Sequence, residues 1–370
     1  MAILVYFLLV ITLLLNSKSR ALQLIAVLYI FVLFAFSYNC ADRLWYETKL
    51  NSFEEFSSVT EPGFYYFMLI LNRCSLGVQY ECAIIGFAYL STLLFLFRKS
   101  SNYTGYVLGM YMIANFFMDV IQLRFTLSLV FVYWGLYYLI FEISNRAAYL
   151  KFLLFILLAS SIHISSIWFV IMFVIRKFTV KKIVAISIAF AISSLFIIGI
   201  LPKLLDNFFL YDMISVALDA GESAYEKKDI IWRGYMILFD SLCFLYMFRK
   251  MQKTIQNNAT LSYYNELGVK ICLIQLVLIP MLFISANFHR HGLALLPILF
   301  LLVSRNFIYI KRSIYICVIS FIVSIYAFFK YTIGGGIGLG GFEIHGGAQS
   351  NLNLVFLSIF DYNLFFDLFS

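Results

Sequence analysis

His163 is the side chain whose surroundings best suit it to act as a base. It is one of four histidines and lies in "SSIHISS", a polar stretch inside the apolar segment from Lys151 to Arg176. A neutral imidazole that neighbouring hydroxyls orient accepts a proton near neutral pH. A buried histidine that is hydrogen-bonded only for packing is the equal alternative.

Two arginines have the chemistry of an anion site. Arg124 lies in "DVIQLRFTLSL", within a run that otherwise has the composition of a membrane span, and Arg290 lies between two histidines in "FHRHG". The guanidinium is a planar fork that binds oxyanions with two parallel hydrogen bonds. The alternatives are an interfacial anchor for either arginine, or a pairing of Arg124 with Asp119 that fixes a turn.

The elements that position these side chains must be membrane helices. Of the 370 residues 63% are hydrophobic and 12% are charged, and the mean hydropathy is +0.92. A span needs about 20 apolar residues, so the sequence predicts an all-α polytopic membrane protein with about ten or eleven spans. Besides the first helix, we expect spans near residues 21–38, 80–97, 103–120, 122–141, 183–201, 231–248, 268–287, 292–310 and 313–333.

Cationic linkers give the topology. Lysines and arginines cluster between the apolar runs, at Lys18/Arg20, Arg98/Lys99, Arg146/Lys151, 176–182, 249–253 and Lys311/Arg312. Cytoplasmic loops carry the excess of positive charge. We therefore predict one transmembrane domain over residues 1–370, with external loops at about 39–79, 202–230, 288–291 and 334–350.

Two segments do not fit simple spans. Residues 103–141 would form a helix about 58 Å long, so the chain must turn, and the polar group Asp119, Gln122 and Arg124 places an external turn there. The segment from Lys151 to Arg176 has cations at both ends, which favours a re-entrant helical hairpin over a polar-centred span.

The first external loop holds further candidates. It is long for a membrane connector, and its "EPGFYYFMLILNRC" portion has an apolar face at helical spacing that predicts an interfacial helix. Glu61 and Tyr65 begin this portion and Arg73 ends it. A carboxylate such as Glu61 is more often a solvated loop charge.

The sequence does not favour binding of nucleic acid, nucleotides or metal ions. The net charge of +8 is divided among short linkers, so no nucleic-acid groove is expected. The stretch "TIGGGIGLGGFEIHGG" lacks the strand and helix of a phosphate-binding loop. No metal-ligand spacing occurs, and we expect neither a metal nor another cofactor.

Five short motifs, in order, resemble the EpsG family of bacterial polysaccharide polymerases, related in role to the Wzy O-antigen and capsule polymerases. They are "ADRLWYE", "EPGFYYF", "DVIQLRFTLSL", "SSIHISSIWF" and "FHRHGLALLPI", and they cover the first three hundred or so residues. The layout of the first loop is also similar to that of GT-C glycosyltransferases.

The resemblance implies a glycosyltransferase reaction at the periplasmic face of a bacterial inner membrane. A hydroxyl of one undecaprenyl-pyrophosphate-linked repeat unit attacks the anomeric carbon of another, forming O-antigen, capsule or exopolysaccharide. Membrane lipids and a chain-length regulator protein are the further expected partners. The implied roles are a base at His163 or Asp42, diphosphate binding by Arg124, Arg290, Arg73 and Arg233, and sugar or loop contacts by Glu61, Tyr65, Asp119 and Gln122.

Two other functions stay open. A lipid-linked oligosaccharide flippase would also have many helices and buried cations, although no internal repeat of the kind common in transporters is visible. A membrane O-acyltransferase that decorates the glycan would likewise use a histidine within the membrane.

Overall fold

The computed structural model describes residues 2–36, 46, 61–142, 147–199, 227–255, 258–282 and 288–305, which form helices and, within these ranges, no strand. Three of the described helices are long and apolar enough to cross a membrane, Val78–Ser100, Leu123–Phe141 and Ala259–Met281, and four apolar helices are shorter. The all-α, polytopic membrane fold is confirmed. The chain divides into two compact units, Met1–Val170 with Phe328–Ser370, and Ile171–Ala327, which are described separately.

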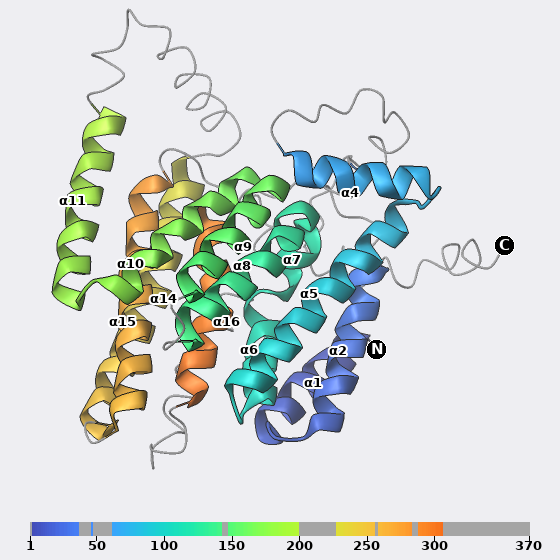
Figure 1. Ribbon diagram of the computed structural model, residues 1–370. Coiled ribbons are helices and arrows are strands. Elements are labelled where there is room, and N and C mark those ends of the chain that lie inside the picture. The colour runs from blue at the N-terminus through green and yellow to red at the C-terminus, as the bar shows by residue number, and fades with distance from the viewer. Residues whose placement is uncertain are drawn as a thin grey trace, which may run out of the picture. The chain divides into compact units, whose positions relative to one another are not determined.

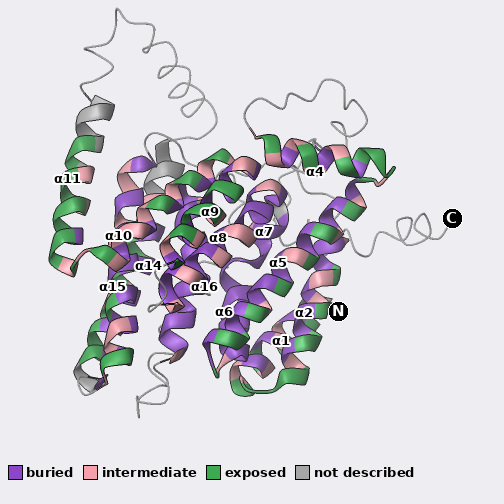
Figure 2. Ribbon diagram, viewed as in Figure 1, coloured by how far each residue is buried: buried purple, intermediate pink, exposed green. Residues whose placement is uncertain are grey.

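Unit 1 is built around two buried helices. Its helices are α1 (Ala2–Leu15), α2 (Arg20–Ala35), α4 (Pro62–Arg73), α5 (Val78–Ser100), α6 (Thr104–Ala114), α7 (Phe116–Ile121), α8 (Leu123–Phe141) and α9 (Ala148–Ile162). Every residue of α6 is buried, and α8 packs between α5 and α9. Figure 2 shows this contrast with α1, α2 and α5, whose outer faces are exposed, as expected of helices that face lipid.

The long apolar run of residues 103–141 is broken twice. A break at Gln122, between α7 and α8, lies where the polar cluster predicted it. A second break, at Asn115, separates α6 from α7, so residues 103–120 are not the single helix that we expected. Asp119 and Gln122 are each 5% exposed, so their side chains are buried at this break, and its place on the external side stays a prediction. These two polar side chains lie within the helix bundle.

The helix α4 lies crosswise to α5, as Figure 1 shows. Its buried face carries Phe64, Met68 and Leu71, a spacing of four and three residues that places them on one side of a helix. Proline at its first position suits a helix start, because that residue's amide has no partner within the helix. The outward face carries Tyr66 and Ile70, each 60% exposed. This amphipathic helix matches the interfacial segment that the sequence predicted.

The cations of unit 1 gather at the other end of α5. Arg98 donates to the side chain of Gln23 at 3.1 Å and to the carbonyl of Arg20 at 3.1 Å. The ammonium of Lys99 lies 4.8 Å from the centre of the Tyr137 ring near the end of α8. Two cationic linkers therefore meet at the end of unit 1 that lies away from α4, separated from it by the length of α5, about 33 Å at 1.5 Å per residue.

Helix α9 runs antiparallel to α8 and ends at the polar break. Gly135 of α8 faces Phe152 of α9, and the Phe125 ring lies 5.5 Å from the His163 ring. His163 itself has an extended backbone, and a 3-10 helix, Ile164–Met172, follows. The interruption at "SSIHISS" is confirmed. Whether the chain then turns back to form the re-entrant hairpin stays a prediction.

Unit 2 contains α10 (Phe173–Lys177), α11 (Val180–Gly199), α14 (Lys227–Ile255), α15 (Ala259–Met281) and α16 (Phe288–Arg305). Within it, α15 packs on α11, α14 and α16. The motif "FHRHG" forms the first turn of α16, not the loop that the sequence predicted. The expected span at 313–333 and the loop at 334–350 lie outside the described residues.

Candidate functional site

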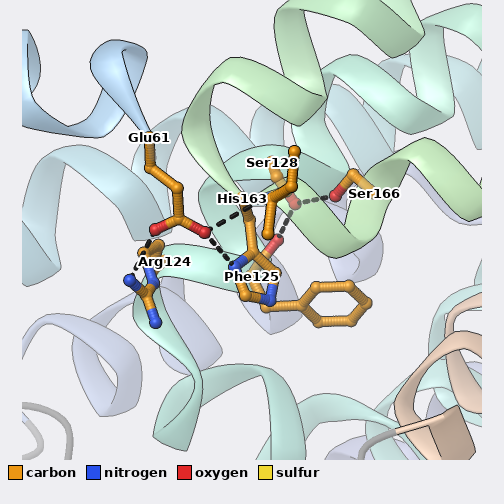
Figure 3. Close-up of polar contacts among 7 residues, drawn as sticks. Glu61, Arg124, Phe125, Ser128, His163 and Ser166 are labelled. Carbon is orange, nitrogen blue, oxygen red and sulfur yellow. Dashed lines mark hydrogen bonds and ion pairs between the residues drawn. The ribbon is translucent and has the colours of Figure 1, made fainter. Parts of the chain in front are cut away.

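One carboxylate, that of Glu61, connects three segments of unit 1 that are far apart in the sequence. Its Oε2 accepts a hydrogen bond from Nη1 of Arg124 at 2.5 Å. Its Oε1 accepts from Nδ1 of His163 at 2.9 Å and from the backbone amide of Ile164 at 3.0 Å. Figure 3 shows the carboxylate between the guanidinium and the imidazole. We call Glu61, Arg124 and His163 the Glu61 cluster.

The cluster forms where three element ends meet. Glu61 is the residue before α4, Arg124 lies in the first turn of α8, and His163 follows the last residue of α9. Gly63 makes the approach of α4 to α9 close, because a Cβ atom added there would lie 3.0 Å from the Ser161 carbonyl carbon. Only a residue without a side chain fits at this contact.

Opposing effects set the charge of Glu61. Burial acts to raise its pKa, but the hydrogen bonds from His163 and the Ile164 amide, together with the charge of Arg124, outweigh burial. The pKa of Glu61 therefore lies below its ordinary value of 4.5. The carboxylate is ionised at neutral pH and neutralises the guanidinium beside it.

Among the described residues, Glu61 is the hydrogen-bond partner of Arg124, through Nη1. Its side chain is 34% exposed, against 11% for Glu61, and the ring of Phe64 lies 5.9 Å from its Cζ. Glu61 is bonded to Nη1, which leaves the edge formed by Nε and Nη2 for a further acceptor. The carboxylate partner of Arg124 is thus Glu61, and the pairing with Asp119 considered from the sequence does not form.

The geometry of His163 suits a base. A carboxylate can only accept hydrogen bonds, so Nδ1 of His163 donates to Glu61, and in the neutral ring Nε2 then carries the lone pair. The hydroxyls of Ser128 and Ser166 are 2.8 Å apart, and that of Ser128 also donates to the Phe125 carbonyl at 2.6 Å. Both serines are fully buried and tie the segment after His163 to α8 (Figure 3).

Asp119 belongs to a separate polar group within unit 1. Tyr89 donates to its Oδ2 at 2.7 Å, and the hydroxyl of Thr126 donates to its backbone carbonyl at 2.7 Å. The second bond joins α7 to α8 across the break at Gln122. Asp119 therefore helps to shape the backbone that carries Arg124, and the sugar or loop contacts that the resemblance implies for Asp119 and Gln122 stay predictions.

Of three further candidates of the first loop, the two that the structure describes are not part of the cluster. Tyr65 is half-buried in the first turn of α4 and lies edge-on to Tyr66. Arg73 is exposed in the last turn of α4, about 18 Å along the helix from Glu61. Asp42 lies outside the described residues.

Unit 2 holds the other two arginines that were candidates for diphosphate binding, Arg233 and Arg290. Arg233 of α14 donates through Nη1 to Nδ1 of His289 at 2.7 Å. A guanidinium has no acceptor, so this imidazole nitrogen must accept and His289 is neutral. Arg290 is half-buried in the same turn of α16, while His289 and His291 are buried. Within unit 2 these side chains form a second basic group.

Sequence reasoning did not find the central role of Glu61, nor the parts played by the Ile164 amide and the Ser128 and Ser166 pair. Glu61 bonds to residues 63 and 102 positions away, and no spacing in the chain encodes such a contact. The one local signal is its place directly before Pro62, which predicts a helix start with a carboxylate at its end. The described residues contain no group of three or more His, Cys, Asp or Glu side chains that could hold a metal ion.

Comparison with known families identifies the chain. The model of the EpsG family matches residues 20–337, a region that includes the whole Glu61 cluster and the basic group of unit 2. No curated protein and no solved structure matches the chain. The chain therefore belongs to the EpsG family, and it is a membrane protein of the polysaccharide polymerase type.

Proposed function

We propose that the protein polymerises undecaprenyl-pyrophosphate-linked repeat units at the periplasmic face of the bacterial inner membrane. The observation that carries this proposal is the Glu61 cluster, which places an anion-binding arginine and an oriented histidine on the two oxygens of one carboxylate. Transfer from a lipid diphosphate needs both a cation for the leaving group and a base for the acceptor hydroxyl.

The reaction divides between these residues. The acceptor hydroxyl attacks the anomeric carbon of the donor sugar, a new carbon–oxygen bond forms, and the bond from that carbon to the diphosphate oxygen breaks. Nε2 of His163 takes the hydroxyl proton, and Glu61 stabilises the imidazolium that results. The Nε and Nη2 edge of Arg124 holds the charge of the departing undecaprenyl pyrophosphate. One arginine does not balance a diphosphate, so Arg290, Arg233 and Arg73 are proposed as further cations, and Asp42 is the second choice as base.

The side of the membrane follows from charge. Lys18, Arg98 and Lys99 lie at the end of unit 1 away from α4. If that end is cytoplasmic, as the positive-inside rule predicts, the Glu61 cluster faces the periplasm. An external site suits substrates that have already crossed the membrane.

Chain length in cells tests the proposal. In a deletion strain complemented with Arg124→Ala or Arg290→Ala, we expect the long-chain polymer to be lost while the protein stays inserted. Arg124→Lys should also be impaired, because a point charge replaces a planar fork. Immunoblots of membranes and silver-stained polymer gels measure both. Normal chain lengths in both alanine variants would contradict the diphosphate assignment.

The same deletion strain separates the other two functions. Loss of a polymerase leaves lipid capped with a single repeat unit. Loss of a flippase leaves uncapped lipid, and loss of an O-acyltransferase leaves normal ladders with altered acetyl content.

A further inference from the structure

The bonds to Glu61 have the composition of an oxyanion site. Arg124 donates from a guanidinium, His163 from an imidazole and Ile164 from a backbone amide at the start of a 3-10 helix. Arginine, histidine and amide donors together are the groups that proteins use to bind phosphate. In this structure a carboxylate of the chain itself occupies their common point.

The two oxygens of that carboxylate are held unequally. Oε1 is bonded to two donors, His163 and the Ile164 amide, whereas Oε2 is bonded to Arg124. Arg124 is also the most exposed member, at 34%. An incoming anion therefore exchanges with Glu61 at Arg124 first, while the bond that orients His163 stays in place.

Phospholipid phosphates are anions that could bind Arg124 in place of the substrate. The outward face of α4 carries Tyr66 and Ile70, both 60% exposed, which is typical of a helix at the lipid interface. An arginine at the lipid interface that has no carboxylate partner binds the phosphate of an ordinary phospholipid. Every anionic phospholipid would then compete with the substrate.

The charge of an anion decides whether it displaces Glu61 from Arg124. Coulomb energy scales with the product of the charges, and Arg124 with Glu61 is neutral as a pair. A phosphodiester carries one negative charge and replaces the carboxylate without a net gain, whereas a diphosphate carries at least two and gains from the exchange. Glu61 is bonded to Nη1 of Arg124, which leaves the Nε and Nη2 edge for the second phosphate.

We infer that Glu61 is a specificity-determining residue, which keeps Arg124 neutralised so that a lipid diphosphate binds and a phospholipid phosphodiester does not. This inference rests on the proposed function, because it takes Arg124 as the diphosphate ligand. It adds a selection step that the reaction itself does not require.

The test compares two probes on the full-length protein in a neutral detergent. Isothermal titration calorimetry with inorganic pyrophosphate and with dihexanoyl phosphatidylglycerol gives two dissociation constants for each variant. In Glu61→Gln we expect phosphatidylglycerol to bind about tenfold more tightly, because the neutral amide no longer competes with a singly charged phosphate for Arg124. Pyrophosphate, which carries more charge, should improve at least as much. Glu61→Asp keeps the charge on a shorter arm and should give a smaller gain for both probes.

Two further variants of the protein serve as controls. Glu142→Gln makes the same change in the ion pair with Lys151, at the far end of α8, and should leave both constants as in the wild type. Glu61→Gln combined with Arg124→Gln should lose the gain in phosphatidylglycerol binding. If the role of Glu61 is purely structural, Glu61→Gln should instead bind both probes more weakly.

The outcomes separate this inference from the proposed function. Phosphatidylglycerol binding that is as weak in Glu61→Gln as in the wild type would overturn the role of Glu61, even if Arg124 binds pyrophosphate. If Arg124→Gln alone binds pyrophosphate as tightly as the wild type, the diphosphate assignment of Arg124 is wrong, and the inference is overturned with it.

Discussion

Glu61 is a carboxylate whose three hydrogen-bond donors define its state at neutral pH. Two of them, Arg124 and His163, were candidates from the sequence because arginine and histidine are conspicuous inside apolar runs. Glu61 was a candidate only for sugar binding or loop support, since a carboxylate in a polar loop has no such contrast with its neighbours. Residue types were thus predictable, but the bonds between them depend on which helix ends meet.

The lowered pKa of Glu61 predicts how the stability of unit 1 depends on pH. A carboxyl group whose pKa is lower in the folded protein stabilises the fold above its ordinary value of 4.5, and this contribution is lost as the pH falls through the lower, folded value. The wild type should therefore unfold at a higher temperature than Glu61→Gln at pH 7, and the difference should disappear only below pH 4.5.

Thermal unfolding in detergent between pH 3.5 and 7.5, in steps of about half a unit, measures this difference. Glu142→Gln is the control, because Glu142 contacts Lys151 at the longer distance of 3.7 Å. A difference that already disappears well above pH 4.5 would show that the carboxylate is not stabilised as the geometry requires.

At the scale of elements, polar residues inside apolar runs located two of the helix breaks. Asp119, Gln122 and Arg124 predicted the break at Gln122, and "SSIHISS" predicted the break at His163. The break at Asn115 was missed because one asparagine is compatible with a helix and gives no comparable signal. The helical first turn of α16 was not predictable for the opposite reason, since adjacent histidine and arginine residues suggest a polar loop although both are tolerated in helices.

The contact between α4 and α9 predicts that Gly63→Ala disrupts the Glu61 cluster. Its Cβ would lie 3.0 Å from the carbonyl carbon and oxygen of Ser161, and overpacking of this kind costs about 1–3 kcal/mol. The gain in helix propensity from glycine to alanine is about 1 kcal/mol or less, so the clash decides the outcome. We expect α4 to shift away from His163 and long-chain polymer to decrease.

Gly77→Ala is the matched control, because a Cβ there has nothing within 4 Å. Gly77 precedes α5, beyond the end of α4 that lies away from Glu61, so any effect on α5 should leave chain length unchanged. Polymer gels and membrane levels of both variants measure the contrast. Equal chain lengths in the two variants would show that α4 tolerates displacement from α9.

At the scale of the whole molecule, composition predicted the all-α membrane fold, because a chain with 63% hydrophobic residues has no way to bury them in water. Lys18, Arg20 and Arg98 lie at one end of unit 1, as linkers on one side of a membrane require, and the cytoplasmic location of that end stays a prediction. The division into two compact units was not predictable from a continuous series of apolar runs. Packing between helices sets such a division, and hydropathy does not report it.

The path of the chain after His163 is the remaining prediction about topology. Helix α9 begins near Lys151, at the end of unit 1 where the cations gather, and ends at the Glu61 cluster. If residues 151–176 form a re-entrant hairpin, Arg176 returns to the side of Lys151, as the positive-inside rule favours. Single cysteines at these two positions, in a protein whose six native cysteines are serine, should resist a membrane-impermeant maleimide in intact cells and react after permeabilisation. Native Cys74, exposed at the end of α4, should react from outside when it alone is retained. Labelling of just one of positions 151 and 176 in intact cells would instead establish a single crossing through the break at His163.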